Sequence, residues 1–167
     1  AVGAIGFGGL FAVYAYLTAA IIATTDAPSW AVPAALAMFG IGGTLGTWGA
    51  GRVTEKVGQV RAAYLALATM AVTQGFAAYA VGNWPMMILS SFLLAAGSGL
   101  VIPLQTRLMD VAGPAQNMAA AMNHASFNFA NAIGPFLAGL AMSAGYGYAS
   151  NGMVGILLTA AGAVVLT

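Results

Sequence analysis

The sequence contains no cysteine and very few charged side chains, and these absences narrow its class at once. Its 167 residues include four Lys and Arg, three Asp and Glu and a single His. Without cysteine there is no disulfide, thiol nucleophile or thiolate metal site, and the few acids are too sparse for a metal cluster. A formal net charge of +1 is too small to neutralise a run of phosphates. We therefore expect no nucleic-acid partner, no metal and no cofactor.

Apolar residues make up most of what is present. They account for 61% of the chain, charged residues for only 4%, and the mean hydropathy is +0.92. A soluble domain carries roughly 25% charged residues, which it needs to cover a surface that faces water. The composition therefore predicts an all-α integral membrane protein.

Polar turns divide the chain into apolar runs that each suit one crossing of a bilayer. A hydrocarbon core about 30 Å thick needs about 20 apolar helical residues. Charges, prolines or glycine-rich turns separate the runs. The sequence predicts six transmembrane helices, at about 1–23, 30–50, 62–81, 86–106, 118–142 and 152–167.

The basic residues predict the orientation of these helices. Arg52, Lys56 and Arg61 lie in the second predicted loop and Arg107 in the fourth, and the other loops hold none. The positive-inside rule places those two loops, and with them both chain ends, in the cytoplasm. The apolar runs continue to both ends, so we expect a piece of a longer protein.

A polar stripe marks the fifth predicted helix. His124, Asn128, Asn131 and Pro135 fall on one narrow face at about 100° per residue. Polar groups at membrane depth face a watery cavity or bond to another helix, and we expect a substrate cavity here. His124 is also the only group within the predicted helices that titrates near neutral pH, so a proton relay would lie elsewhere.

Two tyrosines of the first predicted helix are further cavity candidates. Tyr14 and Tyr16 lie at membrane depth, too deep for interfacial anchors. They point about 160° apart on a helix, so that only one can face a given cavity. We expect Tyr14 to be the cavity residue.

Small and weakly polar residues predict how the helices pack. Gly42 and Gly46 have the small-xxx-small spacing that lets helices approach closely, although a helix that bends during transport is a second interpretation. Other polar residues at membrane depth are expected to make local or interhelical hydrogen bonds: Thr73, Gln74, Ser90, Ser91 and Ser98.

The second predicted loop, residues 51–61, forms a charged turn. Its charges serve either to set the topology or, with those of the fourth loop, to form an ion-pair network that closes one conformation. The candidate gating residues are Gly51, Arg52, Glu55, Lys56, Gly58, Arg61, Arg107 and Asp110.

This turn resembles the inter-helix loop motif of the major facilitator superfamily, in its second-half copy. The matching residues read Gly51-x-x-x-Glu55-Lys56-x-Gly58-Gln59-x-Arg61. Glu55 replaces the commoner Asp, and Gln59 stands where a basic residue is frequent. Residues 8–16, 103–109 and 123–135 are similar to the arabinose-efflux-permease and drug:proton antiporter branch.

The resemblance implies the C-terminal six-helix half of a twelve-helix bundle, whose N-terminal half is absent here. It implies alternating access, with the first, second, fourth and fifth helices around the cavity. The expected activity is proton-coupled efflux of a small molecule such as a drug, a sugar or a nucleoside-like metabolite. The expected partners are this substrate, protons, the missing half and the lipid of a bacterial inner membrane, and the expected site residues are Tyr14, His124, Asn128 and Asn131.

Two other functions remain open at this point. Ser98 and His124 lie at broadly similar depth, as in an intramembrane serine protease, although the residues around Ser98 depart from the rhomboid pattern. The second alternative is a membrane module that works only by helix association. It predicts that loss of Asn128 or Asn131 harms assembly and not flux.

Overall fold

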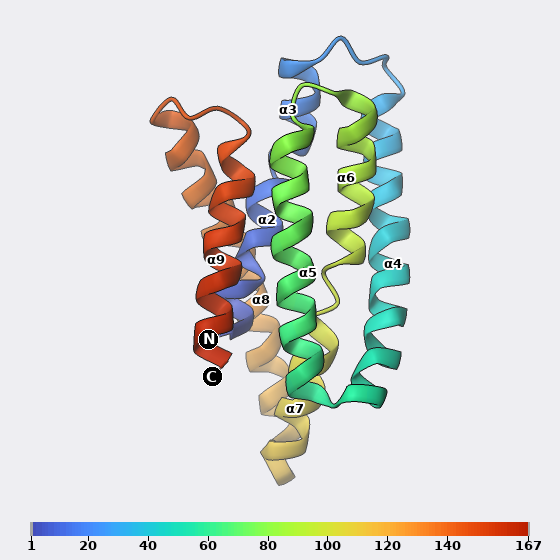
Figure 1. Cartoon of the computed structure of the whole chain (residues 1–167). Coiled ribbons are helices and arrows are strands. Elements are labelled where there is room, and N and C mark those ends of the chain that lie inside the picture. Colours follow the sequence, from blue (N-terminus) through green and yellow to red (C-terminus); the bar gives the residue numbers. More distant parts are fainter. Residues whose placement is uncertain (1, 167) are drawn as a thin grey trace.

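The chain runs back and forth as a bundle of helices that lie side by side (Figure 1). The computed structural model describes residues 2–166, and no strand occurs among them. The predicted all-helical fold is confirmed. The helices are α1 Val2–Gly6, α2 Gly8–Tyr14, α3 Leu17–Thr24, α4 Ala31–Val57, α5 Gln59–Ala80, α6 Trp84–Ala96, α7 Val101–Ala112, the 3-10 helix η1 Gly113–Ala115, α8 Gln116–Ser143 and α9 Ser150–Leu166.

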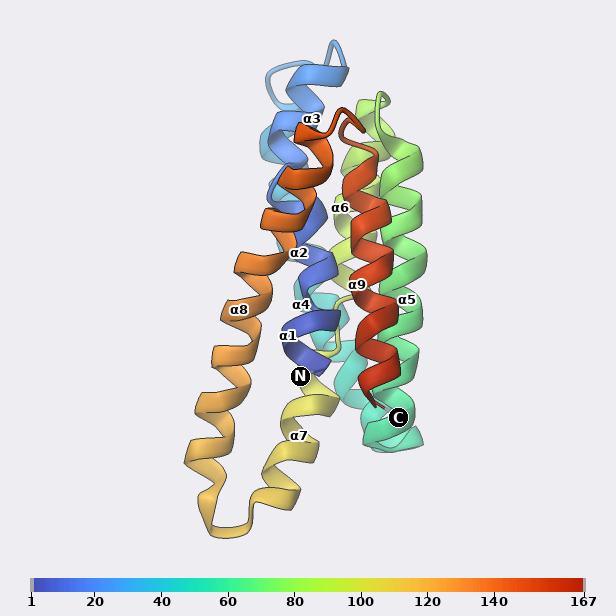
Figure 2. The same cartoon turned by 90° about the vertical axis from the view of Figure 1, so that its left-hand side faces the viewer.

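The turns gather at two opposite ends of the bundle. The connections α3–α4, α5–α6 and α8–α9 lie at one end, and the turns α4–α5 and α7–α8 at the other (Figures 1 and 2). Both described chain ends lie toward the second end. The end of α4, the start of α5 and the end of α7, which carry most of the charged residues, also lie at this end (Figure 1).

Three stretches are long and apolar enough to cross a membrane: Val2–Thr24, Ala31–Val57 and Trp84–Ser143, with Ser150–Leu166 apolar but shorter. The third stretch is not one rod, because α7 and α8 meet at η1 and run back beside each other (Figure 2). Helices lie within all six predicted ranges, with breaks at residues 7, 15–16 and 97–100, and the predicted end residues 1 and 167 lie outside the described residues. The count of six crossings stays a prediction.

The expectation of a turn over residues 51–61 was wrong. α4 continues to Val57 and α5 begins at Gln59, so that Gly58 alone makes the turn. Residues 51–57 contain no proline to interrupt the helix, and the Gly58 amide donates to the Thr54 carbonyl. Gly58 has φ +84°, a left-handed conformation that glycine adopts without steric cost. The charged residues therefore lie on rigid helix ends.

Proline at position 103 causes the break between α6 and α7. Pro103 has no amide hydrogen to donate to the Gly99 carbonyl, four residues earlier, and its ring crowds that carbonyl. The Gly99 carbonyl instead accepts from the amide of Ile102 at 3.3 Å. The helix is interrupted over residues 97–100, and two glycines in this interval let the backbone pass close to its neighbours.

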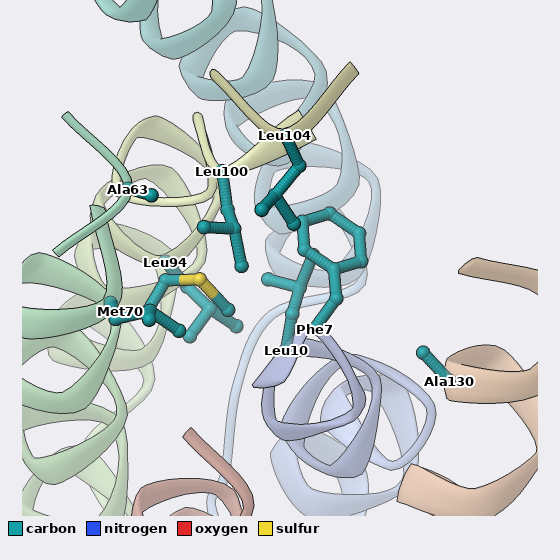
Figure 3. Close-up of a cluster of buried hydrophobic side chains, with 9 residues drawn as sticks. Phe7, Leu10, Ala63, Met70, Leu94, Leu100, Leu104 and Ala130 are labelled. Carbon is teal, nitrogen blue, oxygen red and sulfur yellow. The ribbon is translucent and has the colours of Figure 1, made fainter. Parts of the chain in front are cut away.

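The largest apolar core lies where α2, α5, α6, α7 and α8 meet (Figure 3). Phe7, at the break between α1 and α2, packs edge-on against Phe127 of α8, with ring centroids 4.8 Å apart. The break thus places a large ring between helices that elsewhere touch through small residues. The other buried members of the core are Leu10, Ala63, Leu67, Met70, Leu94, Leu100, Leu104 and Ala130.

Glycines set the closest helix contacts. A Cβ atom on Gly46 of α4 would lie 2.8 Å from Ala96 Cα of α6, and one on Gly42 would meet the Phe92 carbonyl. A Cβ atom on Gly134 of α8 would meet the Gly8 carbonyl of α2. Lipid gives little drive for association, so backbone approach at such points holds the bundle together. Between the two interpretations of these α4 glycines, the structure shows close packing along an unbroken helix.

Buried polar side chains bond as expected from the sequence. The Thr159 hydroxyl of α9 donates to Gln74 Oε1 of α5 at 3.0 Å, and the Ser91 hydroxyl of α6 donates to the Ala35 carbonyl of α4 at 2.7 Å. Thr73, Ser90 and Ser98 donate within their own helical segments. The predicted local and interhelical hydrogen bonds are confirmed.

Two glycines of α4 give a matched test of this packing. Gly46→Ala should cost about 1–3 kcal/mol, because its methyl group forces α4 and α6 apart. Gly40→Ala, where nothing lies within 4 Å, should be neutral or stabilise the helix by up to about 1 kcal/mol. Thermal unfolding in detergent measures both. Equal melting temperatures for the two variants would mean that the α4–α6 contact is not tight.

Candidate functional site

The exposed surface of α8 is divided into two stripes of opposite character. His124, Asn128 and Asn131 are exposed on one side. Met118, Met122, Phe129 and Phe136 are exposed on another, between 55% and 65%. At about 100° per residue the two stripes are centred roughly 120° apart. Only the second has the chemistry of a surface that faces acyl chains, so the first faces something else.

The polar stripe borders the first segment of the chain. The Tyr16 hydroxyl, between α2 and α3, donates to the Pro135 carbonyl of α8 at 3.1 Å. Gly139 makes room for this contact, since a Cβ atom there would lie 2.7 Å from the Tyr16 hydroxyl. Pro135 belongs to the same stripe as the two asparagines. The stripe therefore lies on the side of α8 that adjoins residues 2–24.

The three polar side chains of the stripe make no hydrogen bond to any other part of residues 2–166. An amide at membrane depth without a partner is costly, so such groups face water, a ligand or another chain. Asn123 differs in position: it lies on the packed side of α8 and is buried, with its Nδ2 unpaired among the described residues. The amides of Asn128 and Asn131 are thus free to bind a polar group from outside this chain.

The two tyrosines lie on opposite sides of the first segment. Tyr14 stacks on Phe39 of α4, with ring centroids 4.0 Å apart and planes at 27°. Tyr16 bonds to α8 instead. The expectation that they point apart is consistent with this. Tyr14 stays a cavity candidate on the α4 side. Tyr16, which we did not expect at a cavity, is the tyrosine beside the polar stripe.

The charged residues at the end of the bundle that holds Gly58 and η1 form a hydrogen bond and a cation–π contact but no ion pair among the described residues. Gln59 at the start of α5 donates to the carboxylate of Asp110 on α7. Arg52 lies over the ring of Trp48, 3.5 Å from its centroid. Within the described range no Asp or Glu is paired with Lys or Arg. In this conformation a single hydrogen bond, Gln59 to Asp110, joins the start of α5 to α7. The ion-pair network, one of the two roles expected for these charges, is not formed among the described residues.

The residues of the protease alternative are not joined. The Ser98 hydroxyl donates to the Ala95 carbonyl at 2.6 Å, within its own chain segment, and makes no hydrogen bond to His124. A serine nucleophile needs a base within hydrogen-bond reach. Nor do three His, Asp or Glu side chains gather as a metal site anywhere in the part of the chain that the structure describes.

Thiol labelling tests which stripe of α8 meets water. The chain has no cysteine of its own, so single cysteines can be introduced cleanly. Asn128→Cys and Asn131→Cys should react with a small charged thiol reagent at least tenfold faster than Phe129→Cys, because thiolate forms in water and not in lipid. Labelling of the full-length protein in membranes measures the rates. Similar rates at residues 128 and 129 would place both stripes in one environment.

Comparison with known proteins agrees with the architecture. The chain is 28% identical over 154 residues to the inner membrane transport protein YdhP of Escherichia coli K12, and 24% identical over 163 residues to the uncharacterized MFS-type transporter YfhI of Bacillus subtilis. These alignments cover 92% and 98% of this chain but only 40% and 41% of the relatives. No family model and no solved structure matches.

The chain therefore spans about 40% of the length of the curated relatives that it matches. Its apolar helices and its membrane relatives together support an integral membrane protein. The resemblance to the major facilitator superfamily, drawn from the loop motif, agrees with the similarity to the MFS-type transporter YfhI and to the inner membrane transport protein YdhP.

Proposed function

We propose that the chain forms the second half of an alternating-access transporter that moves a small molecule across a bacterial inner membrane. The observation that carries the proposal is the unpartnered polar stripe of α8, set on a helix whose other exposed stripe is apolar. Such a stripe fits the wall of a water-filled substrate pathway. The pathway's other wall comes from the missing first half of the same protein.

The helix pairing supports this assignment. In the proposed half, α1–α5 form one three-span repeat and α6–α9 form the second, inverted repeat. α4 packs mainly on α6, and α8 packs mainly on α2, so the second span of each repeat contacts the first span of the other. α5 and α9, the third span of each repeat, pack on each other. This exchange is what a pseudo-twofold axis between inverted repeats requires.

The charge distribution supports a cytoplasmic location for the end that holds Gly58 and η1. All four basic residues lie on the helix ends that meet there. The positive-inside rule then places both described chain ends in the cytoplasm. At the other end Trp30 and Trp84 pack edge-on at 5.1 Å, where aromatic side chains suit the opposite interface.

The cytoplasmic gate consists of the loop-motif residues together with α7. In this conformation the Gln59–Asp110 hydrogen bond holds the gate residues of α5 and α7 together. A single exposed bond of this kind is worth about 1 kcal/mol or less, so that it can break and re-form during a transport cycle. Glu55, Lys56 and Arg61 are exposed beside it and are available for other pairings when the helices move.

The substrate and its coupling are inferred from the family branch. Efflux of a drug, a sugar or a nucleoside-like metabolite fits amides flanked by tyrosines, which bind polar groups and apolar rings alike. No acid lies in the middle of any helix between residues 2 and 166, so proton coupling depends on acids in the missing half, with His124 as the only titratable group of the stripe.

Substitution of the amides distinguishes transport from assembly. Asn128→Ala and Asn131→Ala should leave the abundance of the full-length protein unchanged but lower substrate affinity about 5- to 10-fold, since each loses one hydrogen bond of about 1–1.5 kcal/mol. Uptake by energised everted vesicles, screened with amphipathic drugs, sugars and nucleosides, measures this. Phe129→Ala is the matched control. Normal transport with poor assembly would favour the helix-association alternative.

A second experiment tests the gate. Gln59→Leu removes this hydrogen bond to Asp110 and should raise cytoplasmic labelling of a cysteine at residue 128 about 2- to 5-fold, the effect of losing about 1 kcal/mol or less. Glu55→Gln should act in the same direction if Glu55 closes the gate. Thr106→Val is the control, because the Thr106 hydroxyl bonds only to the Ile102 carbonyl of its own helix. Unchanged labelling in both gate variants would leave these charges as topology determinants.

A further inference from the structure

An apolar groove lies between α4 and α5, on a different part of the molecule from the polar stripe of α8. It has a volume of about 310 Å³, and its floor is the interrupted segment between α6 and α7. Figure 1 shows α4 and α5 joined at the turn after α4 and separated along their lengths. Leu45 of α4 and Leu65 of α5 form opposite rims and are 50% and 52% exposed. The α8 residues of the substrate site do not contribute to it.

Two glycines, Gly97 and Gly99, form part of the floor of the groove, beside Ala96 and Pro103. A Cβ atom on Gly99 would meet Ala50 of α4, and one on Gly97 would lie 3.2 Å from Thr69 Cγ2 of α5. The segment therefore touches both walls and carries no side chain at either contact. A Cβ atom on Gly49, by contrast, would have nothing within 4 Å of it, so the space above the floor is open. An apolar chain can lie there in contact with both helices.

The charges at one mouth of the groove identify the occupant. Leu45, Gly49, Arg52 and Lys56 follow one another along one side of α4. The first two line the edge of the groove, and the two cations continue the same side of the helix beyond it. Arg61 lies one turn before Leu65 on α5 and is exposed. Glu55 is about a quarter turn from this face, and Asp110 keeps its charge when it accepts from Gln59, so this end carries four cations (Arg52, Lys56, Arg61 and Arg107) against two carboxylates. The mouth is thus basic, and the groove behind it is apolar.

We infer that this groove binds an anionic phospholipid, with one acyl chain between α4 and α5 and the phosphate held by Lys56 and Arg61. A phosphate beside an acyl chain matches a basic mouth on an apolar slot, and basic pockets between transmembrane helices on the cytoplasmic side favour such headgroups. Trp48, whose ring lies under Arg52, is about two turns before Lys56 on α4, where an aromatic side chain suits the region below the headgroups. The site requires that the chain lies in a membrane, and it does not depend on what is transported.

The location couples the lipid to the gate. Lys56 and Arg61 flank Gly58, the one-residue turn whose neighbour Gln59 bonds to Asp110. A phosphate that bridges α4 and α5 across this turn holds the two helix ends together on the side away from α7. The bound lipid therefore stabilises the arrangement in which the Gln59–Asp110 bond is made.

Native mass spectrometry of the full-length gene product tests the site. The protein is titrated with phosphatidylglycerol and, separately, with phosphatidylcholine of the same acyl chains. One phosphatidylglycerol should bind more tightly than any phosphatidylcholine. Lys56→Gln together with Arg61→Gln should weaken this binding about 10- to 30-fold, and Gly49→Phe, which fills the groove, should abolish it.

Matched controls separate the groove from general membrane affinity. Arg107→Gln removes a cation at the same end but away from the groove, and Leu157→Phe enlarges an exposed side chain of α9; both should retain full binding. Equal retention of the two lipids, or unchanged phosphatidylglycerol binding in the double charge variant, would overturn the inference. The charge variants alter only exposed side chains, so this result does not depend on whether Gly49→Phe folds.

Discussion

The structure depends on backbone contacts between helices at glycine. Lipid supplies no hydrophobic drive that would hold one transmembrane helix against another, so close approach must do so. Gly134 brings α8 against Gly8 of α2, and Gly42 and Gly46 bring α4 against α6. These contacts decide which face of each helix is covered. For α8 they cover the small residues Ala130, Gly134 and Ala138, and they leave the amides outside.

The same constraint links the proposed substrate pathway to the lipid groove. The polar stripe of α8 and the groove between α4 and α5 each lie beside a close helix contact that leaves a neighbouring face uncovered. The two uncovered faces differ in the side chains that they carry. On α8 the uncovered face carries amides without partners. Between α4 and α5 the uncovered space is apolar and ends in cations. The Gln59–Asp110 bond joins the start of α5 to α7, and α7 packs on α8, so that α7 connects the helix pair of the groove to the helix of the polar stripe.

Much of the fold could be predicted from the sequence because composition and periodicity act locally. Apolar runs fixed the helices, and the polar stripe of α8 followed from spacing alone. Three features could not be predicted. The charged turn is helical because no proline interrupts the hydrogen bonds of α4 over residues 51–57, and the helix ends only at Gly58. The position of Tyr16 beside α8 depends on the absence of a side chain at Gly139. The Gln59–Asp110 bond joins residues 51 positions apart and required the tertiary arrangement.

The central claim is that the amide face of α8 meets a polar space while its aromatic face meets lipid. A cryo-electron microscopy map of the complete protein in a lipid nanodisc tests this most directly. The account predicts acyl-chain density against Met122, Phe129 and Phe136, and solvent or the companion half opposite Asn128 and Asn131. Acyl-chain density packed against the Asn128 amide would contradict it.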